Sequence, residues 1–163
     1  MGWKIVNGIL NTVITVCIVA VLALFLCNAA GLRTYVVQSG SMEPAIGTGS
    51  LCFVNTHASF GQITEGDIIA FELPTGTLAT HRVIDVMPDG LETQGDNTEQ
   101  SDGISTTREN FVGETLFAIP KIGYVIHFLT TTRGMILGIT GVLCLIILNH
   151  LLPSGEKEKA ADK

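Results

Sequence analysis

The 163-residue chain is poor in charged residues, and basic residues are the scarcest. Only 15% of the residues are charged, with 9 Lys and Arg against 15 Asp and Glu, which gives a formal net charge of −6. Such a chain has no basic face for polyphosphate, so we expect no nucleic-acid partner. The hydrophobic share of 47% excludes a disordered tail and a collagen-like fibre.

Cysteines that could pair outside a membrane are also lacking. Cys17, Cys27 and Cys144 fall inside or beside two long apolar runs near the chain ends, where they behave as small apolar residues. Cys52 alone lies between these runs, so that region cannot form an internal disulfide. There is no Cys-x-x-Cys pair and no paired histidine spacing, so the sequence indicates neither a metal site nor a cofactor.

The first apolar run predicts a transmembrane helix. Twenty-eight residues without formal charge separate Lys4 from Arg33, and about 20 apolar residues are enough to cross a bilayer. The alternative is a cleaved signal peptide, since Ala29 and Ala30 follow the run, but cleavable apolar cores usually have only about 7–15 residues. We therefore assign residues 1–33 to a short cytoplasmic N-terminus and a first transmembrane helix.

The second apolar run predicts another transmembrane helix at residues 134–155, between Arg133 and Glu156. A buried helix of a soluble protein is the alternative. Lysines are slightly more numerous on the terminal sides of the two runs, which favours cytoplasmic termini. The remaining segments are then an extracytoplasmic domain at residues 34–133 and a charged cytoplasmic tail at residues 156–163, in a multi-pass protein of the cell membrane.

The segment between the runs has a β pattern. Short β-branched runs recur between turn residues, and helical periodicity is scarce. The fold class expected is mainly β, an antiparallel sandwich or barrel-like domain, because no helical pattern separates the strands as a parallel sheet would require. The expected strands cover residues 34–38, 51–54, 67–71, 78–86, 91–94 and 113–119.

Three short stretches of this domain carry candidate chemistry. Ser41 follows a glycine in a turn, and a nearby base could make it a nucleophile. His81 stands near the start of a strand, and an imidazole can take a proton near neutral pH. Asp96 and Asp102 on one loop could orient that imidazole. Taken singly, each stretch also has an ordinary explanation. The first could be a plain turn, the second a half-buried histidine on a strand, and the third an acidic surface loop.

Their order along the chain resembles a known family. Ser-Gly-Ser-Met-Glu-Pro at 39–44, Gly-Asp-Ile-Ile-Ala at 66–70, Thr-His-Arg-Val at 80–83 and Gly-Asp-Asn at 95–97 together resemble the type I signal peptidases. The closer likeness is to the endoplasmic-reticulum and archaeal branch, which also occurs in Gram-positive bacteria. The resemblance implies the β-rich signal-peptidase fold for the domain between the two transmembrane helices.

Carried over by position, the resemblance implies a role for each candidate residue. Ser41 matches the nucleophile, His81 the general base and Asp102 the third member of the triad, while Asp96 matches a supporting acid. Ser39 matches a residue whose hydroxyl joins the Ser41 N–H in the oxyanion hole. The Ser-Lys branch of the family is a poorer match, because His81 stands where that branch has its lysine.

The function implied is that of a membrane-bound serine endopeptidase. It would remove signal peptides from exported preproteins at the outer membrane face, cleaving after small residues at the first and third positions before the bond. Its partners would be signal peptides, the lipid bilayer and the secretion translocon, without a cofactor. Three alternatives stay open: a non-catalytic membrane adaptor, a peptidase dedicated to one or few secreted proteins, and a self-cleaving repressor-type Ser-Lys protease.

Overall fold

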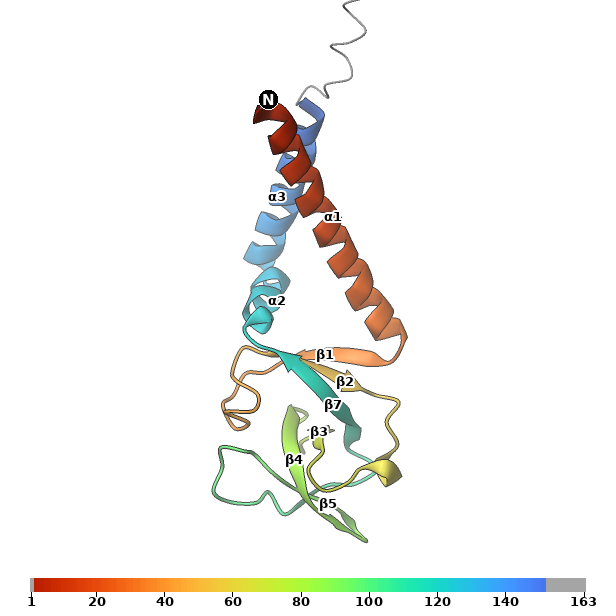
Figure 1. Ribbon diagram of the computed structural model, residues 1–163. Coiled ribbons are helices and arrows are strands. Elements are labelled where there is room, and N and C mark those ends of the chain that lie inside the picture. Colours follow the sequence, from red (N-terminus) through yellow and green to blue (C-terminus); the bar gives the residue numbers. More distant parts are fainter. Residues whose placement is uncertain (1, 152–163) are drawn as a thin grey trace, which may run out of the picture. The chain divides into compact units, whose positions relative to one another are not determined.

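The computed structural model describes residues 2–151 and divides into two units, which are considered separately (Figure 1). Residues 27–127 form a β unit, and the flanking segments on both sides form a helical unit. The elements in chain order are α1 (Gly2–Ala29), β1 (Leu32–Val36), β2 (Leu51–Asn55), the 3-10 turn η1 (Phe60–Gln62), β3 (Ile68–Glu72), β4 (Leu78–Met87), β5 (Gly90–Gln94), β6 (Ile104–Thr106), β7 (Phe111–Ile119), α2 (Ile122–Thr130) and α3 (Thr132–Leu151).

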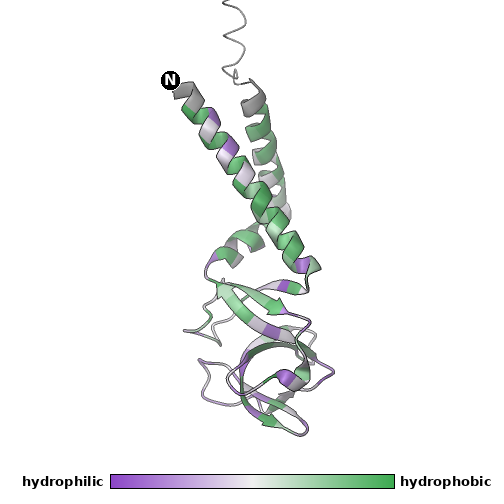
Figure 2. Cartoon of the chain, turned by 45° about the vertical axis from the view of Figure 1, so that its right-hand side comes forward, coloured by the Kyte–Doolittle hydropathy of each residue, from purple (hydrophilic) through white to green (hydrophobic). Residues whose placement is uncertain are grey.

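The N-terminal apolar helix that the sequence predicts is present as α1. Figure 2 shows that most of its residues are hydrophobic, and large side chains such as Val21 and Phe25 are 66% and 69% exposed. An apolar helix that exposes such residues is unstable in water, so α1 is suited to lipid. It ends where Gly31, in the left-handed conformation at φ +81°, turns the chain into β1.

The C-terminal apolar region differs in detail from the helix expected at residues 134–155. It consists of α2 and α3, which are bent by 95° at a short break. Among the described residues, α1 by itself is long and apolar enough to cross a membrane, whereas α2 and α3 meet that criterion only as a pair. Residues 152–155 of the expected helix and the charged tail at 156–163 lie outside the described residues.

The β unit is one curled sheet of seven strands in the order β1-β2-β7-β3-β4-β5-β6, with every neighbouring pair antiparallel. This confirms the antiparallel β-rich class. β7 comes last in sequence but lies between β2 and β3, so it joins the two halves of the sheet. Register shifts at four places, for example between Val83 and Asp85, increase the curl toward a half-barrel.

All six expected strands overlap observed ones; β1 and β7 begin two residues earlier than expected, and the other four agree within one residue at each end. The sequence pattern missed β6, whose three residues are too few to show alternation. It also missed α2, which is shorter than a membrane-spanning run. Both elements are too short for hydrophobic periodicity to identify them.

Side chains from both faces of the sheet form two buried clusters. The first contains Met42, Ile46, Cys52, Val54 and Ala70, and the second contains Ile63, Ile69, Phe71, Val83 and Leu91. Met42 and Ile46 belong to the 14-residue loop between β1 and β2, so part of this loop is core rather than surface. The loop is thereby fixed to the sheet by apolar burial.

Candidate active site

Ser41 lies in the β1–β2 loop, next to a fully buried residue of that loop. Met42 is 2% exposed and packs in the first cluster. A second restraint comes from Glu43, whose Oε1 accepts hydrogen bonds from the Thr48 N–H at 3.2 Å and from the Thr48 hydroxyl at 3.1 Å. The Ser41 hydroxyl is therefore held in place by its neighbours while it remains partly accessible.

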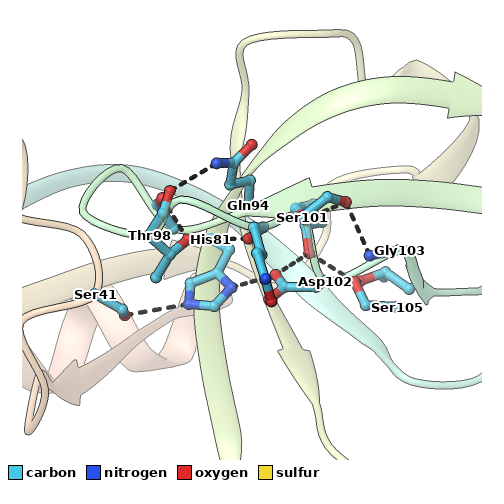
Figure 3. Close-up of polar contacts among 12 residues, drawn as sticks. Ser41, His81, Gln94, Thr98, Ser101, Asp102, Gly103 and Ser105 are labelled. Atoms are coloured by element: carbon cyan, nitrogen blue, oxygen red, sulfur yellow. Dashed lines mark hydrogen bonds and ion pairs between the residues drawn. The ribbon is translucent and has the colours of Figure 1, made fainter.

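His81 lies on β4 and faces this hydroxyl across a short gap. Its Nε2 is 3.1 Å from Ser41 Oγ (Figure 3). The strand pairing places His81 opposite Ile69 of β3, and the Phe71 ring meets the imidazole edge to face with centroids 6.1 Å apart. The imidazole side chain is only 15% exposed, so its orientation is restricted by packing on the second cluster.

Asp102 completes the chain of contacts on the other side of the imidazole. Its Oδ2 lies 2.5 Å from His81 Nδ1 (Figure 3). A carboxylate can only accept hydrogen bonds, so this contact places the ring proton on Nδ1 and leaves Nε2 as an acceptor. Nε2 then faces the Ser41 hydroxyl with a free lone pair, which is the arrangement that a general base requires.

Ser39, the predicted second oxyanion donor, also lies at this point. Its Oγ is 3.3 Å from Ser41 Oγ, and either hydroxyl can be the donor. The structure therefore brings together four of the five predicted site residues: Ser39, Ser41, His81 and Asp102.

Asp96 contacts a different partner. Its carboxylate accepts two hydrogen bonds from Arg82, and a third guanidinium nitrogen of Arg82 donates to the Gly66 carbonyl. The hydrogen bond to Asp96 raises the pKa of Arg82 above its ordinary value. Asp96 therefore contacts Arg82, the residue that follows His81 on β4, and does not contact the imidazole of His81.

Two residues near Asp96 have roles that the sequence did not reveal. The Asn97 N–H donates to the Ser41 carbonyl at 2.8 Å, and its side-chain amide donates to the Gly40 carbonyl at 3.2 Å. Gly95 lies so close that a Cβ there would be 2.6 Å from the Ser41 carbonyl oxygen. The loop after β5 therefore packs directly on the serine loop, and the Gly-Asp-Asn string was the available signal.

Two further residues were missed: Thr93 contacts Asp102 directly, and Ser105 contacts Thr93. Thr93 of β5 donates from its hydroxyl to Asp102 Oδ2 at 2.8 Å, and Ser105 of β6 lies 2.6 Å from the Thr93 hydroxyl. The signal for Thr93 is its alternation with Leu91, which places a threonine on the buried face of a strand.

A groove of about 690 Å³ begins at Ser41 and His81 and runs between the end of β1 and the start of β4. Its walls are largely apolar and include Val37, Met42 and Leu78. Within the part of the chain that the structure describes, no group of three or more His, Cys, Asp or Glu side chains could hold a metal ion. The side chains at the end of the groove suit nucleophilic attack on a bound carbonyl.

Comparison with known proteins shows the family of this chain. The family model described as "Signal peptidase, peptidase S26" matches residues 9–102, more than half of the chain. The chain belongs to this signal peptidase family. Signal peptidase I W of Bacillus subtilis is 32% identical over 130 residues, which cover 72% of this chain and 68% of the relative.

Relatives from eukaryotes are also similar to this chain. The catalytic subunit of the signal peptidase complex from Clavispora lusitaniae is 31% identical over 127 residues, covering 68% of this chain and 75% of the relative. The corresponding subunit from Colletotrichum graminicola is 29% identical over 125 residues, covering 69% and 73%. The resemblance to type I signal peptidases of the endoplasmic-reticulum and archaeal branch is thus confirmed, and with it membership among the serine endopeptidases.

Proposed function

We propose that the chain removes signal peptides from exported preproteins, with Ser41 as nucleophile and His81 as general base. The observation that carries this proposal is the continuous contact from Ser41 Oγ to His81 Nε2 and from His81 Nδ1 to Asp102. Nucleophile, base and orienting carboxylate are all within hydrogen-bond distance, which is the arrangement that serine proteases share. A non-catalytic adaptor would have no need to keep these three side chains in contact.

The reaction follows from the proton on His81 Nδ1, which leaves Nε2 free to accept the proton of the Ser41 hydroxyl. His81 Nε2 accepts the Ser41 proton as Ser41 Oγ attacks the scissile carbonyl, and the oxyanion is stabilised by the Ser41 N–H and the Ser39 hydroxyl. The imidazolium, stabilised by Asp102, then gives its proton to the leaving amine, and an ester on Ser41 remains. Water attacks this ester as it gives a proton to His81. The bond between Ser41 Oγ and the acyl carbon then breaks, the signal peptide leaves with a free carboxyl group, and His81 returns the proton to Ser41 Oγ.

The groove suits a peptide in extended conformation. β1 pairs with β2 on one edge only, and Leu78–His81 of β4 pair with β3 alone because the pairing with β5 begins at Arg82. Both of these backbone edges border the groove, so a substrate strand can add its own hydrogen bonds to them. Ser41 and His81 line the same groove and would face the scissile bond of such a strand.

Membrane attachment follows from the apolar helices. We propose that α1 is a first transmembrane helix and that the α2–α3 region contributes a second, with both termini in the cytoplasm and residues 34–133 outside. An enzyme held in the same bilayer as its substrate searches in two dimensions, which favours the positioning on which catalysis depends. The secretion translocon, which delivers signal peptides to this surface, is the partner expected from that location.

The test is co-expression with a reporter preprotein whose signal peptide is separated from the mature form by size. We expect the wild-type chain to process the reporter, and Ser41→Ala and His81→Ala to abolish processing while the protein stays in the membrane fraction. His81→Lys should also be inactive, because the surroundings of residue 81, including Asp102, suit an imidazole. Processing that persists in Ser41→Ala would overturn the assignment.

A further inference from the structure

A pair of hydroxyl groups lies behind the orienting carboxylate. Thr93 is fully buried, and its hydroxyl donates to Asp102 Oδ2 at 2.8 Å. That oxygen is the same one that receives His81 Nδ1 at 2.5 Å. The backbone adds a further link, since the Asp102 N–H donates to the Thr93 carbonyl at 2.8 Å.

The direction of the next hydrogen bond follows from counting protons. The Asp102 carboxylate has no proton to give, so the single hydroxyl proton of Thr93 points to Asp102. Ser105 Oγ lies 2.6 Å from Thr93 Oγ1, and the Thr93 oxygen can only accept in this contact. The Ser105 hydroxyl must therefore be the donor. Ser105 then donates to Thr93 and Thr93 donates to Asp102, which also accepts the hydrogen bond from His81 Nδ1.

Asp102 needs such support because of where it lies. It is on the loop between β5 and β6, and its side chain is 28% exposed. A carboxylate with one partner on an exposed loop can rotate toward water, whereas two donors on the same oxygen fix its plane and position. Thr93 and Ser105 come from the paired strands β5 and β6, so the second donor is supplied by the sheet.

We propose that Thr93 and Ser105 are positioning residues, which hold the Asp102 carboxylate in register with His81. This inference rests on the proposed function, because it assigns a role toward the Ser41–His81–Asp102 reaction. Thr93 acts through Asp102 and does not itself touch the substrate. The hydrogen bonds from Ser105 and Thr93 are polarised toward the carboxylate, and hydrogen bonds in such a chain strengthen one another.

The experiment measures kcat and KM for cleavage of a synthetic preprotein peptide by the full-length protein in detergent. Thr93→Val keeps the side-chain shape without the hydroxyl, and we expect kcat to fall by about 10- to 100-fold, the range for a hydrogen bond to a charged group. KM should stay within about twofold, because the groove is untouched. Thr93→Ser keeps the hydroxyl and should retain most of the activity. Ser105→Ala should lower kcat by about three- to tenfold.

Thr115→Val is the matched control. Thr115 is buried on β7, and its hydroxyl has no hydrogen-bond partner among the described residues. The same exchange there should leave kcat unchanged, which separates the loss of the Thr93 hydrogen bonds from a general effect of valine in the sheet.

A double-variant comparison decides whether Thr93 acts through Asp102. In an Asp102→Ala background, Thr93→Val should cause no further loss of kcat, because the group it positions is gone. Full additivity of the two losses, or a Thr93→Val enzyme with wild-type kcat, would overturn the inference. If the wild-type chain itself fails to cleave, or if Ser41→Ala cleaves equally well, the proposed function fails instead.

Discussion

Arg82 donates a hydrogen bond to each carboxylate oxygen of Asp96, from Nε at 2.8 Å and from Nη2 at 2.7 Å. Because Arg82 follows His81 on β4, this pair ties the loop after β5 to the strand that carries the imidazole. The two acids of that loop, Asp96 and Asp102, therefore contact neighbouring residues of β4. We interpret Asp102 as the acid that orients the ring and Asp96 as the acid that holds the loop.

This division predicts different outcomes for two alanine variants. Asp102→Ala should reduce kcat by about 10⁴-fold, because an unoriented imidazole is a poor base. Asp96→Ala should reduce kcat by about tenfold or less and should lower the free energy of unfolding by about 1 kcal/mol, since the ion pair is partly exposed. Peptide cleavage and denaturant unfolding check the two effects. A nearly harmless Asp102→Ala beside an inactive but stable Asp96→Ala would reverse the roles.

Gly95 is predicted to be intolerant of a side chain because of its contact with Ser41. A Cβ at this position would be 2.6 Å from the Ser41 carbonyl oxygen, so Gly95→Ala must push the serine loop away. A shift of about 1 Å in a catalytic group can cost about 100-fold in rate, and we expect a loss of kcat of that order. Gly47→Ala is the control and lies in the serine loop itself, between β1 and β2, where nothing is within 4 Å of an added Cβ. Equal activity of the two variants would contradict the geometry.

Cys52 should make the β unit less stable in alkali. Burial raises the pKa of its thiol from the ordinary value of 9.0 to about 11. The unfolded chain therefore loses this proton at lower pH than the folded chain, so the contribution of the thiol to stability is complete below pH 9 and is lost as the pH rises toward 11. Unfolding free energies between pH 8 and pH 11 measure the decline. Cys52→Ala should show a shallower decline, and parallel curves for the two proteins would refute the prediction.

Much of the sheet could be predicted because its signals are local. Alternating residues and turn residues near Gly49, Gly76 and Gly90 mark the strand ends. The order of the strands is not local: β7 lies between β2 and β3 because of contacts between distant segments, which no short window contains. The 95° bend between α2 and α3 was likewise hidden, since α2 lies before Arg133 and outside the apolar run from which the helix was predicted.

The site divides in the same way. The motif resemblance selected Ser39, Ser41, His81, Asp96 and Asp102, and the structure links all of them except Asp96 in one chain of contacts. The partner of Asp96 was not foreseen, although Arg82 stands beside His81 in the sequence, because pairing across the sheet depends on register. The role of Thr93 was still harder to predict, since a buried threonine on a strand is common. Its role follows only from the hydrogen bond to Asp102, which the sequence does not show.

The most direct test is to trap the covalent intermediate on Ser41. Full-length protein in detergent is mixed with a slowly deacylating ester of a signal-peptide sequence, quenched in acid, digested and analysed by mass spectrometry. The account predicts that the acyl group is found on the peptide containing Ser41, that His81→Ala greatly slows its formation, and that Ser41→Ala carries none. Turnover without any acylated Ser41, or an acyl group on another side chain, would contradict the central claim.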